Sequence, residues 1–193
     1  MQVTEGCVVD DKICVVDDKI SGQPPMLLRT LGVADEKQAR QAQRELGQDA
    51  FDFLLDLHRG EPWPAYLARV ERLRLGVEVP KGWVPATFLV AEVAGQVVGR
   101  ASIRHHLNPY LSEVAGHIGI GVRPGFRRRG YATAILRQSL AVAASTGLAQ
   151  VLVTCDASNV GCIKVIENCG GVLEDVAPAR RSAYKSRFWV EAG

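Results

Sequence analysis

One segment, residues 122–132, constrains the fold more than any other part of the chain. It reads VRPGFRRRGYA and lies between a β-branched, glycine-interrupted run at 117–122, typical of a strand, and a stretch at 131–146 whose apolar side chains recur at helical spacing. A strand, a turn and a helix therefore follow one another. The first N–H groups of such a helix lack intrahelical partners, and its dipole favours negative charge, so the sequence predicts an anion site at the turn.

The residues of the turn suit such a site. Gly130 has no Cβ and lets the backbone approach a phosphate closely, while Arg127, Arg128 and Arg129 add positive charge. The Walker pattern and the G-x-G-x-x-G pattern are both absent from the chain, so the turn is not one of the usual nucleotide loops. The alternative is a turn of solvated arginines that binds nothing.

Length and composition favour a single soluble domain. The 193 residues suffice for a substantial core, and 47% hydrophobic with 23% charged residues is ordinary for a globular protein. A formal net charge of +2 is too small to indicate a nucleic-acid partner, because the arginine cluster is local. No run of about 18 uncharged apolar residues occurs, so we expect no membrane partner.

The cysteines point to a reducing compartment. Their number, five, is odd and they form no close pairs, which argues against a disulfide framework. No C-x-x-C pattern occurs, so we expect no metal site. The N-terminus also lacks a positively charged signal region, and together these features predict a cytoplasmic protein.

The first 25 residues stand apart from the rest. The heptapeptide CVVDDKI occurs twice in tandem, at 7–13 and 14–20, and such a repeat is too short for a solenoid. Its apolar spacing fits a short strand or an irregular arm. We therefore expect an N-terminal extension over residues 1–25 and one folded domain over 26–193.

The patterns over the folded domain predict alternating strands and helices. The expected elements are a strand at 26–31, helices at 37–46 (capped by Asp35) and 64–75, strands at 87–93 and 96–106 joined by an Ala94-Gly95 turn, a strand at 117–122, a helix at 131–146, a strand at 151–154, a helix opening at Asn159, and strands at 172–176 and 187–191 separated by a basic loop over 178–185. The chain is expected to break at Asn108-Pro109. Crossover helices make the strands at 117–122 and 151–154 parallel neighbours.

This order resembles the GNAT N-acetyltransferase superfamily over nearly all of residues 26–193. The matching motifs are Arg127-x-x-Gly130-x-Ala132 and the segments 116–132, 153–159 and 165–171. The chain is particularly similar to a group of uncharacterised bacterial acetyltransferases, whose shared marks correspond to residues 82–88, 102–105 and 187–189. The resemblance implies a mixed α/β (α+β), GNAT-like fold. Its central sheet is mixed and mostly antiparallel, with parallel central strands that splay apart, and helices flank it.

The resemblance also implies acetyl-CoA as co-substrate. The cofactor-binding residues carried over are Ile120, Gly121, Val122, Arg127, Arg128, Arg129, Gly130, Tyr131, Ala132 and Asn159. The pyrophosphate would sit on backbone N–H groups of residues 127–132, and the pantetheine would pair like a strand with residues 120–122. Gly119 and Gly121 would allow a bulge and close ligand approach, unless they pack against a helix instead. Asn159 would contact the pantetheine, cap the following helix, or do both.

The chemistry implied by the resemblance is direct attack of an amine on the thioester, which requires a base. His117 is the first candidate, because many relatives carry a glutamate there and an ordinary histidine pKa of about 6.5 suits proton acceptance. A histidine merely packed or hydrogen-bonded at a strand start is the alternative. Glu113 is the fallback and His105 a weaker one.

One position departs from the family pattern. Many members carry a tyrosine as general acid seven residues after the asparagine, and this chain has Ile166 there. A non-catalytic acyl-CoA-binding sensor is therefore the competing function. Cys162 on the same helix would allow a covalent acyl-enzyme, although nothing in the local sequence activates it.

The sequence leaves the acceptor open. The regions that would contact it supply Phe53, Asp56, Trp63, Trp83, Arg180, Arg181 and Tyr184. Asp56 could steer a cationic amine and the tryptophans could line a surface for it, or the aromatic side chains could belong to the core. We expect a small-molecule or peptide amine as the acceptor, and a homodimer stays open.

Overall fold

The computed structural model of this chain describes residues 7–9, 12–16, 24–179 and 182–193. Its strands are β1 (Cys7–Val9), β2 (Lys12–Val16), β3 (Met26–Thr30), β4 (Ala86–Val93), β5 (Gln96–Arg104), β6 (Ile118–Val122), β7 (Gln150–Asp156), β8 (Val172–Ala179) and β9 (Ser182–Glu191). Its helices are α1 (Glu36–Gly47), α2 (Trp63–Leu75), α3 (Pro109–Val114), α4 (Tyr131–Ser145) and α5 (Val160–Glu167), with short 3-10 turns at Val33–Asp35 and Pro124–Phe126.

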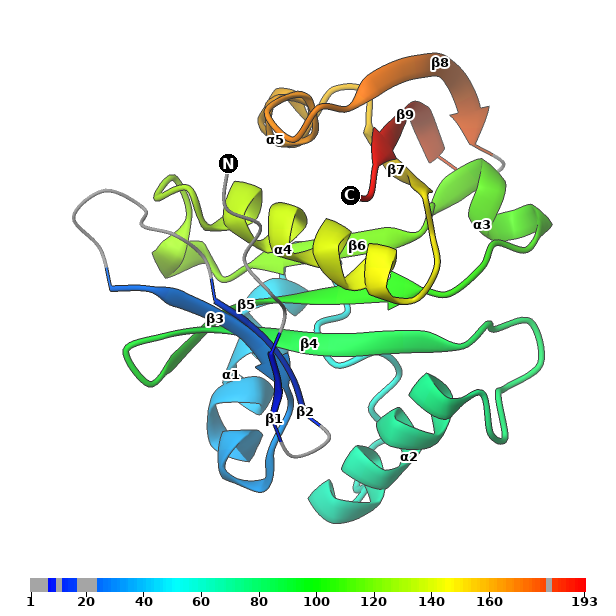
Figure 1. Cartoon of the computed structure of the whole chain (residues 1–193). Coiled ribbons are helices and arrows are strands. Elements are labelled where there is room, and N and C mark those ends of the chain that lie inside the picture. Colours follow the sequence, from blue (N-terminus) through cyan, green and yellow to red (C-terminus); the bar gives the residue numbers. More distant parts are fainter. Residues whose placement is uncertain (1–6, 10–11, 17–23, 180–181) are drawn as a thin grey trace.

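The strands form two antiparallel sheets. The larger has the order β1-β2-β3-β4-β5-β6 and the smaller the order β7-β9-β8. Helices α1 and α2 lie on one face of the larger sheet and α4 on the other (Figure 1). Each face buries its own apolar cluster, one around Phe53 and Tyr66 beneath α1 and α2, the other around Ile135 and Leu136 of α4. This layered burial on both faces is what stabilises a mixed α/β domain.

The β4–β5 hairpin forms as predicted. Its two turn residues, Ala94 (φ 47°) and Gly95 (φ 77°), both adopt positive φ, as a two-residue type I′ turn requires. The ladder then runs from Val93↔Gln96 to Ala86↔Arg104, with one irregularity between Ala91 and Glu92. The hairpin thereby fixes which face each β5 side chain occupies.

The two sheets meet at β6 and β7 and then part. Strand β6 pairs only with β5 and strand β7 only with β9 among the described strands. The main-chain contact between them is the N–H of His117, which donates to the carbonyl of Leu152 at 2.7 Å. The expected splay, which is the gap that opens between β6 and β7 beyond this contact, is present. The bulge expected at Gly119 and Gly121 is absent, since the β5–β6 register runs without a shift.

Three local expectations are corrected. Residues Asn108 and Pro109 start α3 instead of breaking the chain, because the Asn108 side chain accepts from the N–H of Leu111 at 2.9 Å and proline is favoured at a first helical position. Asp35 stands before α1 but does not cap it, since its carboxylate binds Arg29 at 2.7 Å. Strands β8 and β9 extend into the predicted basic loop, although residues 180–181 lie outside the described part.

The described parts of the N-terminal repeat form strands. β1 pairs with β2, placing Cys7 opposite Cys14, and β2 pairs with β3 at the edge of the larger sheet. This matches the strand alternative for residues 7–9 and 12–16. The remaining repeat residues lie outside the described part, and the boundary at residue 25 stays a prediction. Across the described chain, no helix has the length and apolar character needed to cross a membrane.

Candidate functional site

The N-terminus of α4 has no protein cap. Its N-cap residue is Gly130 in the left-handed conformation (φ 84°), no side chain caps it, and its first turn holds no acidic residue. The first main-chain bond into the helix runs from Ala134 N–H to Gly130 O at 3.1 Å. Among the described residues, the N–H groups of residues 131–133 therefore have no partner. A 15-residue helix thus presents the positive end of its dipole to an outside anion.

Arg123, just before the turn, is a structural residue. Its guanidinium is buried and binds both carboxylate oxygens of Glu45 on α1, at 2.8 and 2.9 Å, and the carbonyl of Val97 at 2.8 Å. It fastens the end of β6 to α1 and contributes no charge to an anion site.

The exposed arginines of the turn are only partly available to bind an anion, because protein groups engage two of them. Arg127 binds Asp49 at 2.5 Å and the carbonyl of Val122 at 3.1 Å, and Arg129 donates to a carbonyl within the turn at 3.0 Å. For Arg128, which has a positive φ of 63°, the described residues offer no partner. An anion here would meet backbone N–H groups and Arg128 more than the other side chains.

The edge of β6 that faces away from β5 is open. The main-chain bond from Arg123 N–H to Val98 O (2.9 Å) sets the alternation of the ladder, in which the backbone groups of Gly121 point toward β5. Those of Ile120 and Val122 then point toward the gap between the sheets. Within the described chain, both Ile120 groups and the Val122 N–H have no partner there. This edge can accept an extended ligand as a sheet accepts a strand.

The two β6 glycines have different surroundings. A Cβ on Gly121 would stand 2.5 Å from Cε1 of Phe51, so this glycine makes room for an aromatic ring. A Cβ on Gly119 would lie 3.8 Å from Arg100 Nη1 and 3.9 Å from Arg104 Nη1. Gly121 therefore packs against a ring from the loop after α1 and not against a helix, while Gly119 lies beside two guanidinium groups.

His117 is buried at the start of the splay. Its backbone N–H donates to Leu152 O, and its Nδ1 accepts from Leu152 N–H at 2.9 Å. Burial, helped by the nearby charge of Arg104, lowers the pKa of His117 to about 4. At neutral pH the imidazole is therefore uncharged, with its proton on Nε2. This geometry favours the hydrogen-bonded alternative, and the role of base stays a prediction.

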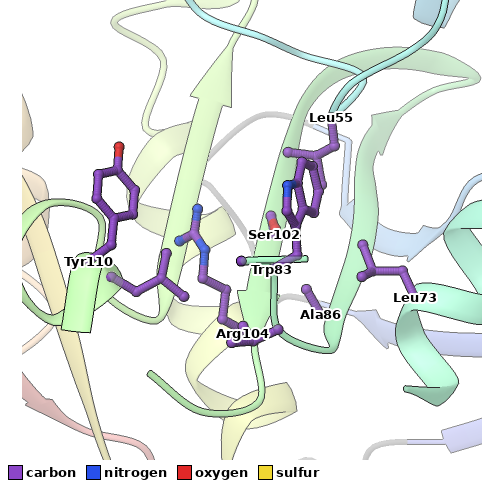
Figure 2. Close-up of a pocket in the computed structure, with 10 residues that line it drawn as sticks. Leu55, Leu73, Trp83, Ala86, Ser102, Arg104 and Tyr110 are labelled. Carbon is purple, nitrogen blue, oxygen red and sulfur yellow. The ribbon is translucent and has the colours of Figure 1, made fainter. Parts of the chain in front are cut away.

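A cavity of about 240 Å³ lies on the α2 face of the larger sheet. Figure 2 shows the Arg104 guanidinium between Tyr110 of α3 on one side and Ser102 and Trp83 on the other. The remaining wall is apolar and includes Leu55. Because Arg104 also lies beside Gly119 of β6, the cavity is close to the splay.

The uncapped helix, the open strand edge and the neighbouring cavity lie in a part of the chain that a family comparison also identifies. The profile of the Acetyltransferase (GNAT) family matches residues 49–170, well over half of the chain. The chain belongs to the GNAT acetyltransferase family. A search of curated proteins finds no significant match by sequence.

Solved structures share this GNAT fold at low sequence identity. One is yncA, a protein from Salmonella typhimurium solved with its cofactor acetyl-CoA, with 17% identity, a TM-score of 0.58, and coverage of 87% of this chain and 94% of that one. Another is Mycobacterium smegmatis RimJ in complex with CoA-disulfide, with 18% identity, a TM-score of 0.60, and coverage of 86% and 81%. An N-acetyltransferase from Staphylococcus aureus Mu50 has 16% identity, a TM-score of 0.57, and coverage of 87% and 99%.

The two other proposed bases come from α3 and from the residue that follows β5. Glu113 is exposed on α3. His105 is hydrogen-bonded through Nε2 to Oγ1 of Thr87 at 2.9 Å, and burial lowers its pKa. The roles of these residues as base stay predictions.

The remaining predicted positions lie at α5 and in the first turn of α4. Asn159 is its N-cap, since Oδ1 accepts from Cys162 N–H at 3.0 Å, and the helix-capping role is therefore present. Ile166 is buried in the core. The Cys162 thiol accepts a hydrogen bond from Cys155, which lowers the pKa of Cys162. Tyr131 and Ala132 lie in the first turn of α4, where Tyr131 is buried.

Most of the predicted acceptor residues do not line the cavity. Phe53 and Trp63 belong to the core, which was the alternative interpretation of the aromatic side chains. Trp83, in contrast, lines the cavity. Asp56 is exposed and its carboxylate is hydrogen-bonded to His58 at 3.2 Å, and it does not line the cavity although its neighbour Leu55 does. Tyr184 is exposed, and residues 180–181 lie outside the described part.

Sequence reasoning missed the polar face of β5. Arg100, Ser102 and Arg104 occupy alternate positions in a strand whose other residues, apart from Gln96 at its start, are apolar or glycine. Polar residues at every second position of an otherwise apolar strand point to the same face of the sheet. This alternation is the signal that could have identified them.

Proposed function

We propose that this protein is an acetyl-CoA-dependent N-acetyltransferase that transfers acetyl to a small amine by direct attack. The observation that carries the proposal is the uncapped N-terminus of α4, which follows directly on the open edge of β6. Both places present main-chain N–H groups without partners in the described chain. Pyrophosphate oxygens and pantetheine carbonyls are the acceptors that such groups bind.

Most of the predicted contacts have a defined part in the proposal, whereas the side chains of Arg127 and Arg129 are engaged within the protein. The backbone of residues 128–132, with the side chain of Arg128, holds the pyrophosphate. Ile120 and Val122 pair with the pantetheine, while Gly121 supports that segment by accepting the Phe51 ring. The amide nitrogen of Asn159 supplies a further donor, because its oxygen is engaged in capping α5.

Acetyl-CoA supplies the acetyl thioester, and the chain positions it beside the cavity. In this proposal His117 is a positioning residue. Its ring nitrogen takes the Leu152 N–H that would otherwise have no acceptor where the sheets separate, so it fixes where the gap begins.

The competing function is a non-catalytic acyl-CoA sensor. Buried Ile166, at the position where many relatives carry the acid, favours it. Both functions require acetyl-CoA binding, and only the enzyme releases CoA thiol in the presence of an amine.

The test is titration calorimetry with acetyl-CoA, followed by thiol release against a panel of amines. Saturable binding and amine-dependent thiol release support the enzyme. Binding without release for every amine would support the sensor, and no binding at millimolar acetyl-CoA would refute both.

A further inference from the structure

Two guanidinium groups on β5 lack carboxylate partners. Arg100 is 5% exposed and donates to the carbonyls of Asp52 (2.8 Å) and Gly119 (3.3 Å), and its Nε has no partner. Arg104 donates to the carbonyl of Gly116 at 3.0 Å and, at 3.4 Å, to the neighbouring one. Among the described residues, no ion pair reaches either group.

Other buried or half-buried arginines of this chain have carboxylates. Arg29 binds Asp35 at 2.7 Å, and Arg123 binds Glu45 at 2.8 Å. Arg69 likewise binds a glutamate at 2.9 Å.

Removing a guanidinium from water costs free energy unless charge and hydrogen bonds offset it. The burial of Arg100 is offset by its two carbonyl partners and by the rings of Phe51 and Phe88, over which its guanidinium lies. Arg104, which lines the cavity, is therefore the group that calls for an external anion.

The two guanidinium groups lie close together and add their positive charge at one place. Their Nη1 atoms both lie within 4 Å of the Cβ position of Gly119. Burial, with the charge of Arg104 beside it, lowers the pKa of Arg100 to about 10, so Arg100 is charged at neutral pH. Burial also lowers the pKa of Arg104, but a guanidinium keeps its proton in proteins. The cavity next to them therefore has a positive potential.

The cavity has walls suited to a small amphipathic molecule. Arg104 is the only charged residue among those that line it in the described chain, and no aspartate or glutamate does. Ser102 and Tyr110 bring hydroxyl groups, while Leu55, Leu73 and Trp83 supply apolar surface (Figure 2). Such walls match a molecule with one anionic group and an apolar body.

We propose that the acceptor is a small amine that also carries a carboxylate, such as an amino acid with an apolar side chain, and that Arg104 binds this carboxylate. The proposal rests on the function proposed above and names its acceptor class. Arg104 lies between the cavity and Gly119 of β6, so a carboxylate held by it leaves the nearby amine close to the splay. Arg100, behind it, adds positive charge without lining the cavity.

The experiment compares matched acceptors. Thiol release is measured with leucine and phenylalanine, with their carboxamides, and with isoamylamine and phenethylamine, which lack the carboxylate. A charge-assisted bond of this kind predicts a kcat/KM advantage of about tenfold to a hundredfold for the amino acids. In Arg104→Gln this advantage is lost, and Arg104→Lys retains part of it. Arg72→Gln, on the exposed side of α2, keeps the full preference.

A binding measurement keeps the proposal testable if turnover is low or a variant is unstable. Calorimetry compares N-acetyl-leucine with N-acetyl-leucinamide on the wild-type protein, with and without CoA. Tighter binding of the carboxylate supports the proposal. Equal binding overturns it, whether or not any acceptor is acetylated. If carboxamides and simple amines are acetylated as well as the amino acids, the acetyltransferase stands and the acceptor class is wrong.

Discussion

At the scale of single residues, Gly130 determines whether the N-terminus of α4 is accessible. The change Gly130→Val places a branched side chain at the uncapped helix start, and we expect the Kd for acetyl-CoA to rise about tenfold or more, measured by calorimetry. The same change also strains a backbone with φ of 84°, at a cost of about 1–3 kcal/mol in stability.

Gly147 provides the matched control for that strain. It has a φ of 89° just beyond the other end of α4, and a Cβ there meets nothing within 4 Å. Gly147→Val should lower the free energy of unfolding by a similar amount while leaving acetyl-CoA affinity unchanged. Equal losses of affinity in the two variants would remove the turn from the binding site.

His117 predicts a specific pH dependence of stability. Its pKa is about 4 in the folded protein and about 6.5 when unfolded, so between these values the unfolded chain binds the extra proton. Stability is therefore full above pH 6.5 and falls as the pH drops toward 4, by roughly 2–3 kcal/mol. Urea unfolding across this range measures the effect.

His117→Asn separates the two interpretations of this residue. Asparagine retains an acceptor for the Leu152 N–H but does not titrate, so the variant should lose much of the pH dependence between 4 and 6.5. If His117 only positions the strands, turnover at pH 7 stays within a few-fold of wild type. A fall in kcat of about a hundredfold, with acetyl-CoA affinity retained, would instead restore its role as base.

At the scale of secondary structure, Asn159 combines a cap with a predicted ligand contact. Asn159→Ala removes the acceptor for Cys162 N–H and should cost about 1 kcal/mol. Asn159→Asp keeps the capping oxygen and should restore that stability, but it lacks the amide donor. Calorimetry should therefore show weaker acetyl-CoA binding in both variants. Wild-type affinity in Asn159→Asp would rule out the amide contact.

The elements that could be predicted have local signals. The Ala94-Gly95 turn and the apolar spacing that begins at Tyr131 were sufficient for the β4–β5 hairpin and α4. The start of α3 was misinterpreted, because Asn108-Pro109 can either break a chain or begin a helix. The ends of β8 and β9 depend on pairing between strands, which local sequence does not encode.

At the scale of the whole molecule, the site depends on contacts between distant parts of the chain. The uncapped start of α4 was predictable, since one local segment defines it. The partner of His117 is Leu152, the ring over Gly121 belongs to Phe51, and Arg100 contacts Asp52. No periodicity in the sequence specifies such pairs. The uncapped helix start was therefore predictable from the sequence and the splay from the family resemblance, whereas the contacts of each polar side chain were not.

The central claim is that acetyl-CoA binds along the open edge of β6 and the start of α4. Amide hydrogen exchange with and without saturating acetyl-CoA tests it most directly, because the N–H groups of Ile120, Val122 and residues 131–133 have no partner in the described chain. The account predicts slower exchange at these positions and no change in α2. Unchanged exchange at β6 and at the start of α4 on saturation, or protection confined to other elements, would contradict it.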